Sequence, residues 1–414
     1  MRTSIFKCEV ITPMLSRSMY QKRESSWRFE LRPQSVKGVM RFWFRALAPC
    51  VVDPDWYEGK HKKFEGLHRL ESMVFGSQER KSPFSITVSY GDNLDNPVED
   101  LTNSPNKFFK NALFGTYGIK DRNGELTSMS FLPPGESIML RIRYSSAVAE
   151  LQKAFTDSLV LLISNYGGFG AKTRDGFGSF AVVGKKDVSN ESIGAQYATS
   201  KLLLESLVKA IDPEGKFYKL SQRDQESLEP YDFPTLAYSR EMTAFSSSND
   251  WRSIIKNLTG QRTMHGDSAS VYSDLKLNRL RKYNEADDNL NPLRAAFFDG
   301  IAPSKEFVMR TSILGLPIIY QKYGRYPGTT GKGLATISND KSGSGRKASP
   351  VFVSIHKAKN NSYFARILLM ASKISPERDD RDRPVIYAKV GSKSYPILGN
   401  ENFEELWNLI EGVI

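Results

Sequence analysis

The feature that most constrains the fold is a glycine-rich stretch, Tyr166 to Phe180, that reads YGGFGAKTRDGFGSF. Five of its residues are glycines, which permit sharp turns and a close approach of the backbone to a neighbour or a ligand. An apolar run typical of a helix end, Leu159 to Ile163, precedes it, and a strand-like segment, Ser179 to Val183, follows it. The stretch therefore joins a helix to a strand. A phosphate-binding Walker loop joins a strand to a helix and ends in Gly-Lys-Ser/Thr, so a nucleotide-hydrolysis loop is excluded.

The segments before this stretch give the first half of the chain a clear order of elements. Residues 3–11 alternate as a strand, and Ser35 is expected to cap a helix over residues 36–47. Strands are predicted at 85–90, 137–144 and 179–183, and a second helix at 147–165. Residues 92–131, rich in Asn, Asp, Gly and Pro, form a long excursion. The order β-α-β-β-α-β is that of a ferredoxin-like unit, whose open sheet face suits single-stranded nucleic acid.

The second half shows a weaker version of the same pattern. Ser349-Pro350 leads into a predicted strand as Ser82-Pro83 does in the first half. Further strands are predicted at 363–370 and 384–390, with helices at 196–211, 250–258, 271–298 and 402–413. Residues 323–347, rich in Gly, Ser and Lys, are expected to form a flexible loop. We therefore predict an α+β fold of two ferredoxin-like (βαββαβ, RRM-like) domains in tandem, residues 1–190 and 191–414, the second degenerate, with long insertions.

The charge balance points to an anionic partner. The 414 residues include 58 Lys and Arg against 46 Asp and Glu, a net charge of +12, which favours a polyanion such as nucleic acid. Neither a run of about 18 apolar residues nor a signal peptide is evident, so a cytoplasmic location is expected. Cys8 and Cys50 are too few and too far apart for a disulfide scaffold or a zinc site. They are expected to be buried free thiols.

Positive charge is concentrated in two regions. The first 45 residues hold ten Lys or Arg, including Arg23 in a basic loop, against three Glu. Within them, Lys37, Arg41 and Arg45 are four residues apart and share one face of the predicted helix, which we call the basic ridge. Residues 310–347 hold seven bases against one acid. A solvated helix face is the alternative for the ridge, but no acidic residue accompanies it at the spacing that paired charges require.

Several motifs resemble those of a known family. RPQSVKGVMRFWFRAL (residues 32–47) and GGFGAKTRDGFGSF (167–180) are similar to the basic helix and the glycine-rich loop of the RAMP superfamily. FGSQERKSPFSITV (75–88) and GLPI (315–318) resemble, within that superfamily, the first RAMP subunit of type III-B (Cmr) CRISPR effector complexes. The motifs cover most of the first 185 residues. In the second half the resemblance rests on GLPI and the Ser-Pro strand.

The resemblance implies a non-catalytic RNA-binding subunit at the head of a guide-RNA complex that targets foreign RNA in antiviral defence, near the 3′ end of the guide. Its partners would be CRISPR RNA, target RNA and other RAMP subunits, with no cofactor, metal or membrane. The basic ridge would hold the RNA backbone together with Lys172 and Arg174, while Gly168 and Gly170 let loop N–H groups approach phosphates. Further candidate contacts are Arg23, Arg325 and Lys332. A purely structural tight turn is the alternative for the loop.

Catalysis is not expected in this chain. Its four histidines, His61, His68, His265 and His356, lack the spacing of any common metal motif. The alternating charges of residues 377–383, ERDDRDR, are typical of a solvated, self-paired loop. The alternative is a metal-independent endoribonuclease, like the guide-processing members of the same superfamily, with His68 or His265 as the base to test.

Overall fold

The structure is a computed structural model of the chain. It describes residues 2–18, 22–23, 26–91, 96–103, 107–110, 112–120, 124–183, 193–221, 228–260, 270–282, 285–321 and 333–414. Helices and sheets are mixed throughout, so the predicted α+β class is confirmed. None of the helices in the described part of the chain has the length and apolar character needed to cross a membrane.

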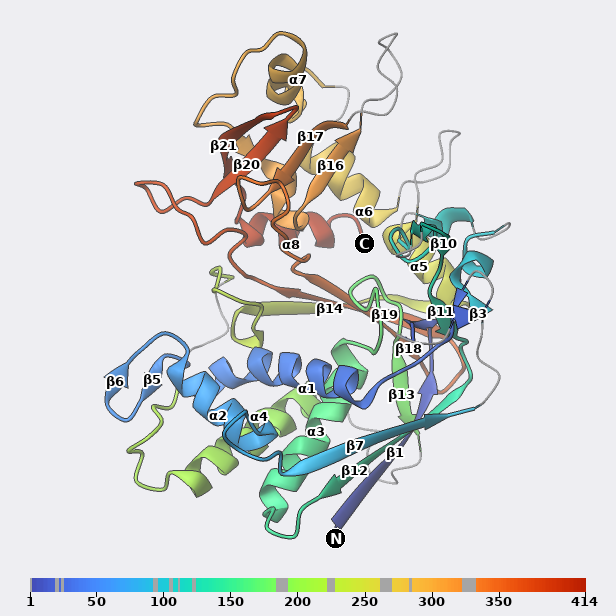
Figure 1. The fold of residues 1–414 in the computed structure, drawn as a ribbon, viewed down its shortest axis with the longest axis vertical. Helices are drawn as coiled ribbons and strands as arrows, with labels where there is room; N and C mark the ends of the chain where they lie inside the picture. The colour runs from blue at the N-terminus through green and yellow to red at the C-terminus, as the bar shows by residue number, and fades with distance from the viewer. Residues whose placement is uncertain are drawn as a thin grey trace.

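The N-terminal half has the predicted order of elements. Strands β1 (Arg2–Val10), β7 (Phe84–Tyr90), β12 (Ser137–Tyr144) and β13 (Phe180–Val183) form an antiparallel sheet in the order β13-β1-β12-β7. Helices α1 (Pro33–Leu47) and α3 (Glu150–Tyr166) cover one face of this first sheet (Figure 1). Side chains alternate along β1, where Phe6, Cys8 and Val10 are buried while Ile5 and Lys7 are exposed on the other face.

Two predictions about single residues have different outcomes. Cys8 and Cys50 are buried free thiols, as expected, and burial raises the pKa of the Cys8 thiol to about 12. The predicted helix cap at Ser35 is wrong, because α1 begins at Pro33 with Arg32 as its N-cap. Proline is favoured at the first helical position, where its missing N–H would have no helical partner.

Further helices and short ribbons surround this sheet. Helix α2 (Glu65–Phe75) lies against α1, and α4 (Ile193–Ile211) lies against α3. Leu204, Leu207 and Val208 of α4 belong to the same core as β1 and α1, so the boundary predicted at residue 190 divides residues that share one core. The short strands are β2 (Met14–Ser16), β3 (Lys22–Arg23), β4 (Ser26–Trp27), β5 (Trp56–Tyr57), β6 (Lys60–His61), β8 (Asn96–Pro97), β9 (Ile119–Lys120), β10 (Leu126–Thr127) and β11 (Ser130–Leu132).

A second, three-stranded sheet lies above α1 and α3. It consists of β14 (Ser239–Ser248), β18 (Val351–Lys357) and β19 (Tyr363–Met370) in the order β14-β19-β18. Its two faces belong to different cores. Phe352, Leu368 and Met370 pack with residues of α1 and α3, whereas Val353, Ile355 and Ile367 pack with α5 (Trp251–Thr259) and α8 (Phe403–Glu411). This middle sheet is therefore covered on both sides (Figure 1).

A third sheet is built from two segments, one between β14 and β18 and one between β19 and α8. Its strands are β15 (Val308–Met309), β16 (Ile318–Gln321), β17 (Gly333–Ser338), β20 (Val385–Val390) and β21 (Lys393–Gly399), in the order β15-β21-β20-β17-β16. Strand β17 pairs with neighbours on both sides, so the prediction of a flexible loop over 323–347 is wrong for residues 333–338. Helix α7 (Asn291–Phe298) packs on this sheet with Leu293 and Ala296. Helix α6 (Val271–Asp274) and a π-helical turn (Leu275–Leu280) precede α7.

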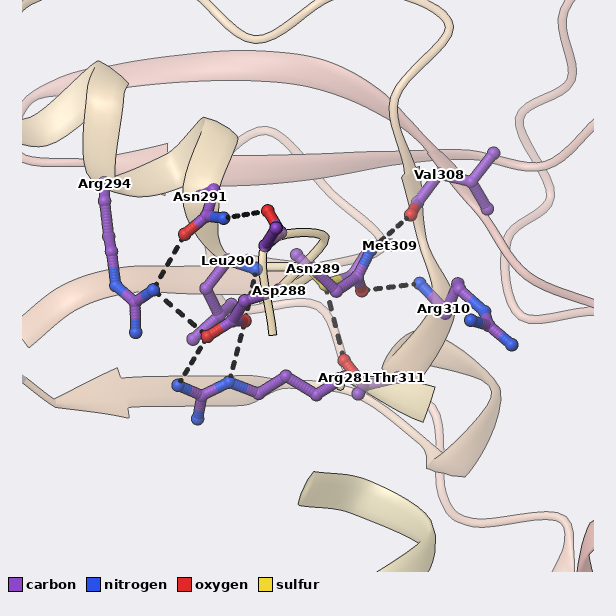
Figure 2. A network of polar contacts seen from close by, with 11 residues as sticks. Arg281, Asp288, Asn289, Leu290, Asn291, Arg294, Val308, Met309, Arg310 and Thr311 are labelled. Atoms are coloured by element: carbon purple, nitrogen blue, oxygen red, sulfur yellow. Dashed lines mark hydrogen bonds and ion pairs between the residues drawn. The ribbon is translucent and has the colours of Figure 1, made fainter. Parts of the chain in front are cut away.

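A polar network fixes the chain where it enters α7 (Figure 2). Asp288 accepts hydrogen bonds from Arg281 Nε at 3.1 Å, Arg294 Nη1 at 3.0 Å and the Leu290 backbone N–H at 2.9 Å. Asn289 accepts from the Arg310 N–H and donates to the Val308 carbonyl oxygen, both at 2.9 Å. Burial opposes ionisation of Asp288, but these hydrogen bonds outweigh it and hold the pKa of Asp288 below its ordinary value. The network ties α7 to the β15 edge of the third sheet.

Candidate nucleic-acid interface

Two arginines of the basic ridge share one carboxylate from a neighbouring helix. Arg41 Nη1 and Arg45 Nε (2.5 Å) both donate to Glu71 of α2, and Arg41 Nη2 also donates to the Gly76 carbonyl oxygen at 2.7 Å. The Glu71 side chain is only 5% exposed, whereas those of Arg41 and Arg45 are 29% and 48% exposed. The arginines are therefore held in fixed orientations while each side chain remains partly exposed.

Lys37 continues the ridge toward β7. Its Nζ donates to Ser82 Oγ at 2.6 Å and lies 5.1 Å from the ring centre of Phe84. Burial, and then repulsion by Arg41, lower the pKa of Lys37. The ridge as a whole holds three cations, of which two share one buried carboxylate, so it keeps a local excess of positive charge. Its predicted geometry is therefore present, but the acidic partner that the sequence reasoning missed comes from α2.

Replacing Glu71 by glutamine is expected to lower the free energy of unfolding at neutral pH by about 2 kcal/mol. Removing one partner of a fully buried ion pair costs roughly 3–5 kcal/mol, and the partial exposure of both arginines reduces this figure. Burial opposes ionisation of Glu71, but the hydrogen bonds from Arg45 and Arg41 bring its pKa below the ordinary 4.5. This stabilisation is complete above pH 4.5 and is lost as the pH falls through the lowered pKa. In urea unfolding, the free energies of unfolding of the variant and the wild type should therefore differ at neutral pH and converge in strong acid.

The glycines of the loop are needed for close approaches between backbone segments. A Cβ atom on Gly168 would lie 2.4 Å from the Gly178 carbonyl oxygen, and one on Gly170 would lie 2.2 Å from that of Leu15. Gly170 and Gly178 also have positive φ angles of 95° and 72°. The loop is folded against itself and against β2, so a structural role accounts for these glycines without a ligand.

Arg174 is directed into the junction between the first and middle sheets. Its guanidinium carbon lies 4.2 Å from the ring centre of Phe352, and its Nη1 donates to the Ser349 carbonyl oxygen. Its own carbonyl oxygen accepts the Val353 N–H at 3.0 Å. Burial lowers the pKa of Arg174 to about 10. Arg174 therefore links the glycine-rich loop to β18 and to the segment that precedes β18.

The other predicted residues lie in different settings. Lys172 is partly exposed, and its charge acts on the carboxyl group of Asp175, whose pKa is raised by burial and lowered by Lys172 and Arg174, with burial the larger effect. The loop meets α1 through Phe42 and Trp43, which lie beside the ridge and not on it. Arg23 belongs to β3. Arg325, Lys332 and His265 lie outside the described residues.

The open face of the first sheet carries further exposed cations. Lys7 of β1 and Arg141 and Arg143 of β12 are exposed there, and Ile5, which is 51% exposed, lies opposite Arg141 in the strand pairing. The alternation of β12 places both arginines on one face. Lys7 could have been found from the same alternation in residues 3–11.

The described histidines differ in their surroundings. His61 and His68 are exposed. His356 Nε2 lies 2.9 Å from Ser354 Oγ and 3.1 Å from the Asn165 carbonyl oxygen. Asp53, Asp55 and His61 bring ligand atoms within 4.8 Å of one another, a grouping that sequence spacing did not indicate. Asp53 and Asp55 already accept backbone hydrogen bonds at the β5–β6 hairpin, from Asp55 and Phe64.

Comparisons with known proteins match both the sequence and the fold. A family model described as the RAMP superfamily matches residues 7–181. Over 228 residues the chain is 26% identical to the CRISPR system Cmr subunit Cmr1-1 of Pyrococcus furiosus, covering 54% of this chain and 61% of that protein. Over 192 residues it is 27% identical to Cmr1-2 of the same organism, covering 44% of this chain and 96% of that protein.

A solved structure supports the fold over the whole chain. The crystal structure of Cmr1 from Pyrococcus furiosus in its apo form superposes with a TM-score of 0.54 at 18% identity, covering 100% of this chain and 97% of that one. At this identity the similarity shows the fold alone. The match to Cmr1-1 spans less than two thirds of that relative's length.

Proposed function

We propose that this chain, whose residues 7–181 match the RAMP superfamily model and which is similar in sequence to Cmr1 subunits, is a non-catalytic RNA-binding subunit of a type III-B Cmr effector complex. In this proposal it acts in antiviral CRISPR defence in the cytoplasm, with CRISPR RNA, target RNA and other RAMP subunits as partners. It holds RNA backbone at the head of the complex, near the 3′ end of the guide. Both curated relatives are named as subunits of a CRISPR Cmr system, which supports the assembly part of the proposal.

The basic ridge is the observation that carries the RNA-binding part. Two arginines fixed by Glu71 have side chains that remain partly exposed, and an oriented guanidinium suits phosphate oxygens. Since phosphate contacts position a protein on RNA without reading its sequence, the ridge fits a subunit that holds backbone while the guide pairs with the target.

We also propose that the second half is a degenerate ferredoxin-like unit. Its order β14-α5-β18-β19-α8 and its sheet order β14-β19-β18 correspond to β1-α1-β7-β12-α3 and to the β1-β12-β7 part of the first sheet. The two Ser-Pro pairs precede β7 and β18, which occupy equivalent places in this correspondence. No strand of the described residues pairs with the outer edge of β14 in the way that β13 pairs with β1.

The salt dependence of RNA binding tests the function. Arg45→Gln and Lys172→Gln are expected to weaken binding of single-stranded RNA nearly equally for all sequences. Each should reduce the slope of log affinity against log salt by about 0.7 for every phosphate group that the variant no longer binds. Filter binding or fluorescence anisotropy over a salt series measures both quantities.

Lys393→Gln is the matched control, because it removes the same charge from an exposed position on β21 in the third sheet. Equal slopes for Arg45→Gln, Lys172→Gln and Lys393→Gln would contradict RNA binding by the ridge and the loop.

The absence of catalysis is part of the proposal and has its own test. Purified protein incubated with CRISPR repeat RNA in the presence of a chelator is expected to leave the RNA intact. Site-specific cleavage that is abolished in a His68 or His265 variant would instead favour the metal-independent endoribonuclease.

A further inference from the structure

A basic cavity lies where the third sheet meets the segment before β18. Its volume is about 270 Å³, and its lining includes Tyr272, Lys276, residues 314–318 and residues 347–349. These residues come from α6, the following π-helical turn, the turn into β16 and the approach to β18. The GLPI motif, residues 315–318, thus forms one wall, and the volume is near the lower end of small-molecule pockets.

The backbone holds the walls of this cavity in place. Leu316 and Lys347 exchange backbone hydrogen bonds of 2.6 Å and 2.8 Å. Gly315 has a φ of +113°, and a Cβ atom there would lie 2.8 Å from the Ser349 nitrogen, so only glycine fits this close approach. Since the Ser349 carbonyl oxygen accepts from Arg174, the wall is also tied to the glycine-rich loop. The cavity is therefore a fixed feature of the junction.

Positive charge dominates the lining. Lys276 and Lys347 both border the cavity, and Lys347 forms no ion pair with any carboxylate in the described part of the chain. Burial, and then repulsion by Arg174, lower the pKa of Lys347 to about 8, against weaker attraction from Glu401 and Asp232. Burial, followed by Arg281, lowers the pKa of Lys276. An anion between the two lysines would favour their charged forms and offset this cost.

An aromatic ring lines the same cavity as the two lysines. Tyr272 is 41% exposed, and Lys276 Nζ lies 5.9 Å from its ring centre. An exposed ring next to paired cations is the combination by which proteins bind unpaired nucleotides, with the base stacked and the phosphate paired. A bare phosphate would use only the lysine part of this surface.

We propose that this cavity binds one nucleotide, with its phosphate between Lys276 and Lys347 and its base against the ring of Tyr272. The assignment of that nucleotide to an RNA strand rests on the proposed function. The chemistry is shared by a free nucleoside monophosphate, so the test separates the two sources.

Calorimetric titration of the full chain with adenosine 5′-monophosphate and with inorganic phosphate tests the site. Adenosine monophosphate is expected to bind more tightly than phosphate, and Lys276→Gln and Lys347→Gln should each weaken its binding at least fivefold. Tyr272→Ala should weaken adenosine monophosphate and leave phosphate unchanged. Lys341→Gln changes an exposed lysine that, like Lys347, precedes β18 in the sequence. It is the control and should bind as wild type does.

The pH dependence of the titration gives an independent readout. Between about pH 7 and 9.5 the nucleotide phosphate stays dianionic, because its second pKa is about 6. Affinity should fall as the pH rises through about 8, where Lys347 loses its proton, and this fall should be absent in Lys347→Gln. No binding to wild type, or equal binding to wild type and both lysine variants, would overturn the proposal.

Competition with a single-stranded RNA separates the sources and the two proposals. RNA that displaces adenosine monophosphate from wild type, and binds more weakly to Lys347→Gln, assigns the cavity to an RNA nucleotide. Nucleotide binding without displacement assigns it to a free mononucleotide. If ridge variants weaken RNA while the cavity variants bind both ligands normally, this inference fails and the proposed function stands.

Discussion

Gly178→Ala is expected to destabilise the protein by about 3 kcal/mol or more, with a matching decrease in the urea midpoint. The residue has a φ of +72°, and a methyl group would lie 2.1 Å from the Phe169 carbonyl oxygen. A left-handed conformation costs a non-glycine residue roughly 1–3 kcal/mol, and overpacking against fixed backbone adds a comparable amount. The Phe169 carbonyl cannot yield, because Phe169 also stacks on Phe180 with ring centres 4.6 Å apart.

Gly38→Ala is expected to change the stability of the same protein in the opposite direction. Gly38 lies within α1, is exposed, and has no heavy atom within 4 Å of an added Cβ. Alanine there should stabilise the protein by about 1 kcal/mol, since glycine is the weaker helix former by that amount. A Gly178→Ala variant that unfolds at the wild-type urea concentration would show that the loop does not require these close approaches.

His356→Gln is expected to reduce the loss of unfolding free energy that occurs as the pH falls. Burial, and then repulsion by Arg366, lower the pKa of His356 from 6.5 to about 3, although a hydrogen bond to the Asn165 carbonyl oxygen acts in the opposite sense. Between pH 6.5 and about 3, the unfolded chain therefore binds a proton at His356 that the folded protein does not bind. Stability is complete above pH 6.5 and falls as the pH drops toward 3, by about 1.4 kcal/mol per pH unit for one group.

Urea unfolding at several pH values measures this effect as a slope. Between pH 6.5 and about 4 the wild type should lose about 3 kcal/mol from His356, and the glutamine variant should lose less by that amount. The comparison rests on slopes, so a constant cost of the substitution does not affect it. His68→Gln, at an exposed position of α2, should keep the wild-type slope. Parallel slopes in wild type and His356→Gln would contradict burial of a neutral imidazole.

The sequence predicts local elements well where one residue pattern decides them. The alternation of β1 and β12, the helical spacing of α1 and the glycine loop between α3 and β13 all depend on residues close together in the chain. The two Ser-Pro pairs also mark strands by local pattern, and β7 and β18 are each the second strand of their sheet in sequence order. Helix α1 begins earlier than predicted because a proline in the first turn is as favourable a start as a serine cap.

Long-range partners account for what the sequence does not predict. Glu71 lies 26 residues beyond Arg45, on a different helix, so no spacing rule pairs them. Arg174 meets a carbonyl group 175 residues away, an internal partner that no spacing rule indicates. Strand β17 is short and flanked by glycine and lysine, so composition hides it, and only pairing with β16 and β20 makes it a strand.

The two-sided middle sheet also governs how the chain can fold during its synthesis. Phe352, Leu368 and Met370 complete the core that contains Trp43 and Leu159, so the first core stays open until the ribosome has made residues more than 300 positions after α1. Contacts this distant in sequence slow folding and leave apolar surface exposed meanwhile. Nascent chains halted before β18 should therefore expose the upper face of α1 and α3 and engage chaperones, whereas release of the full chain closes both cores together.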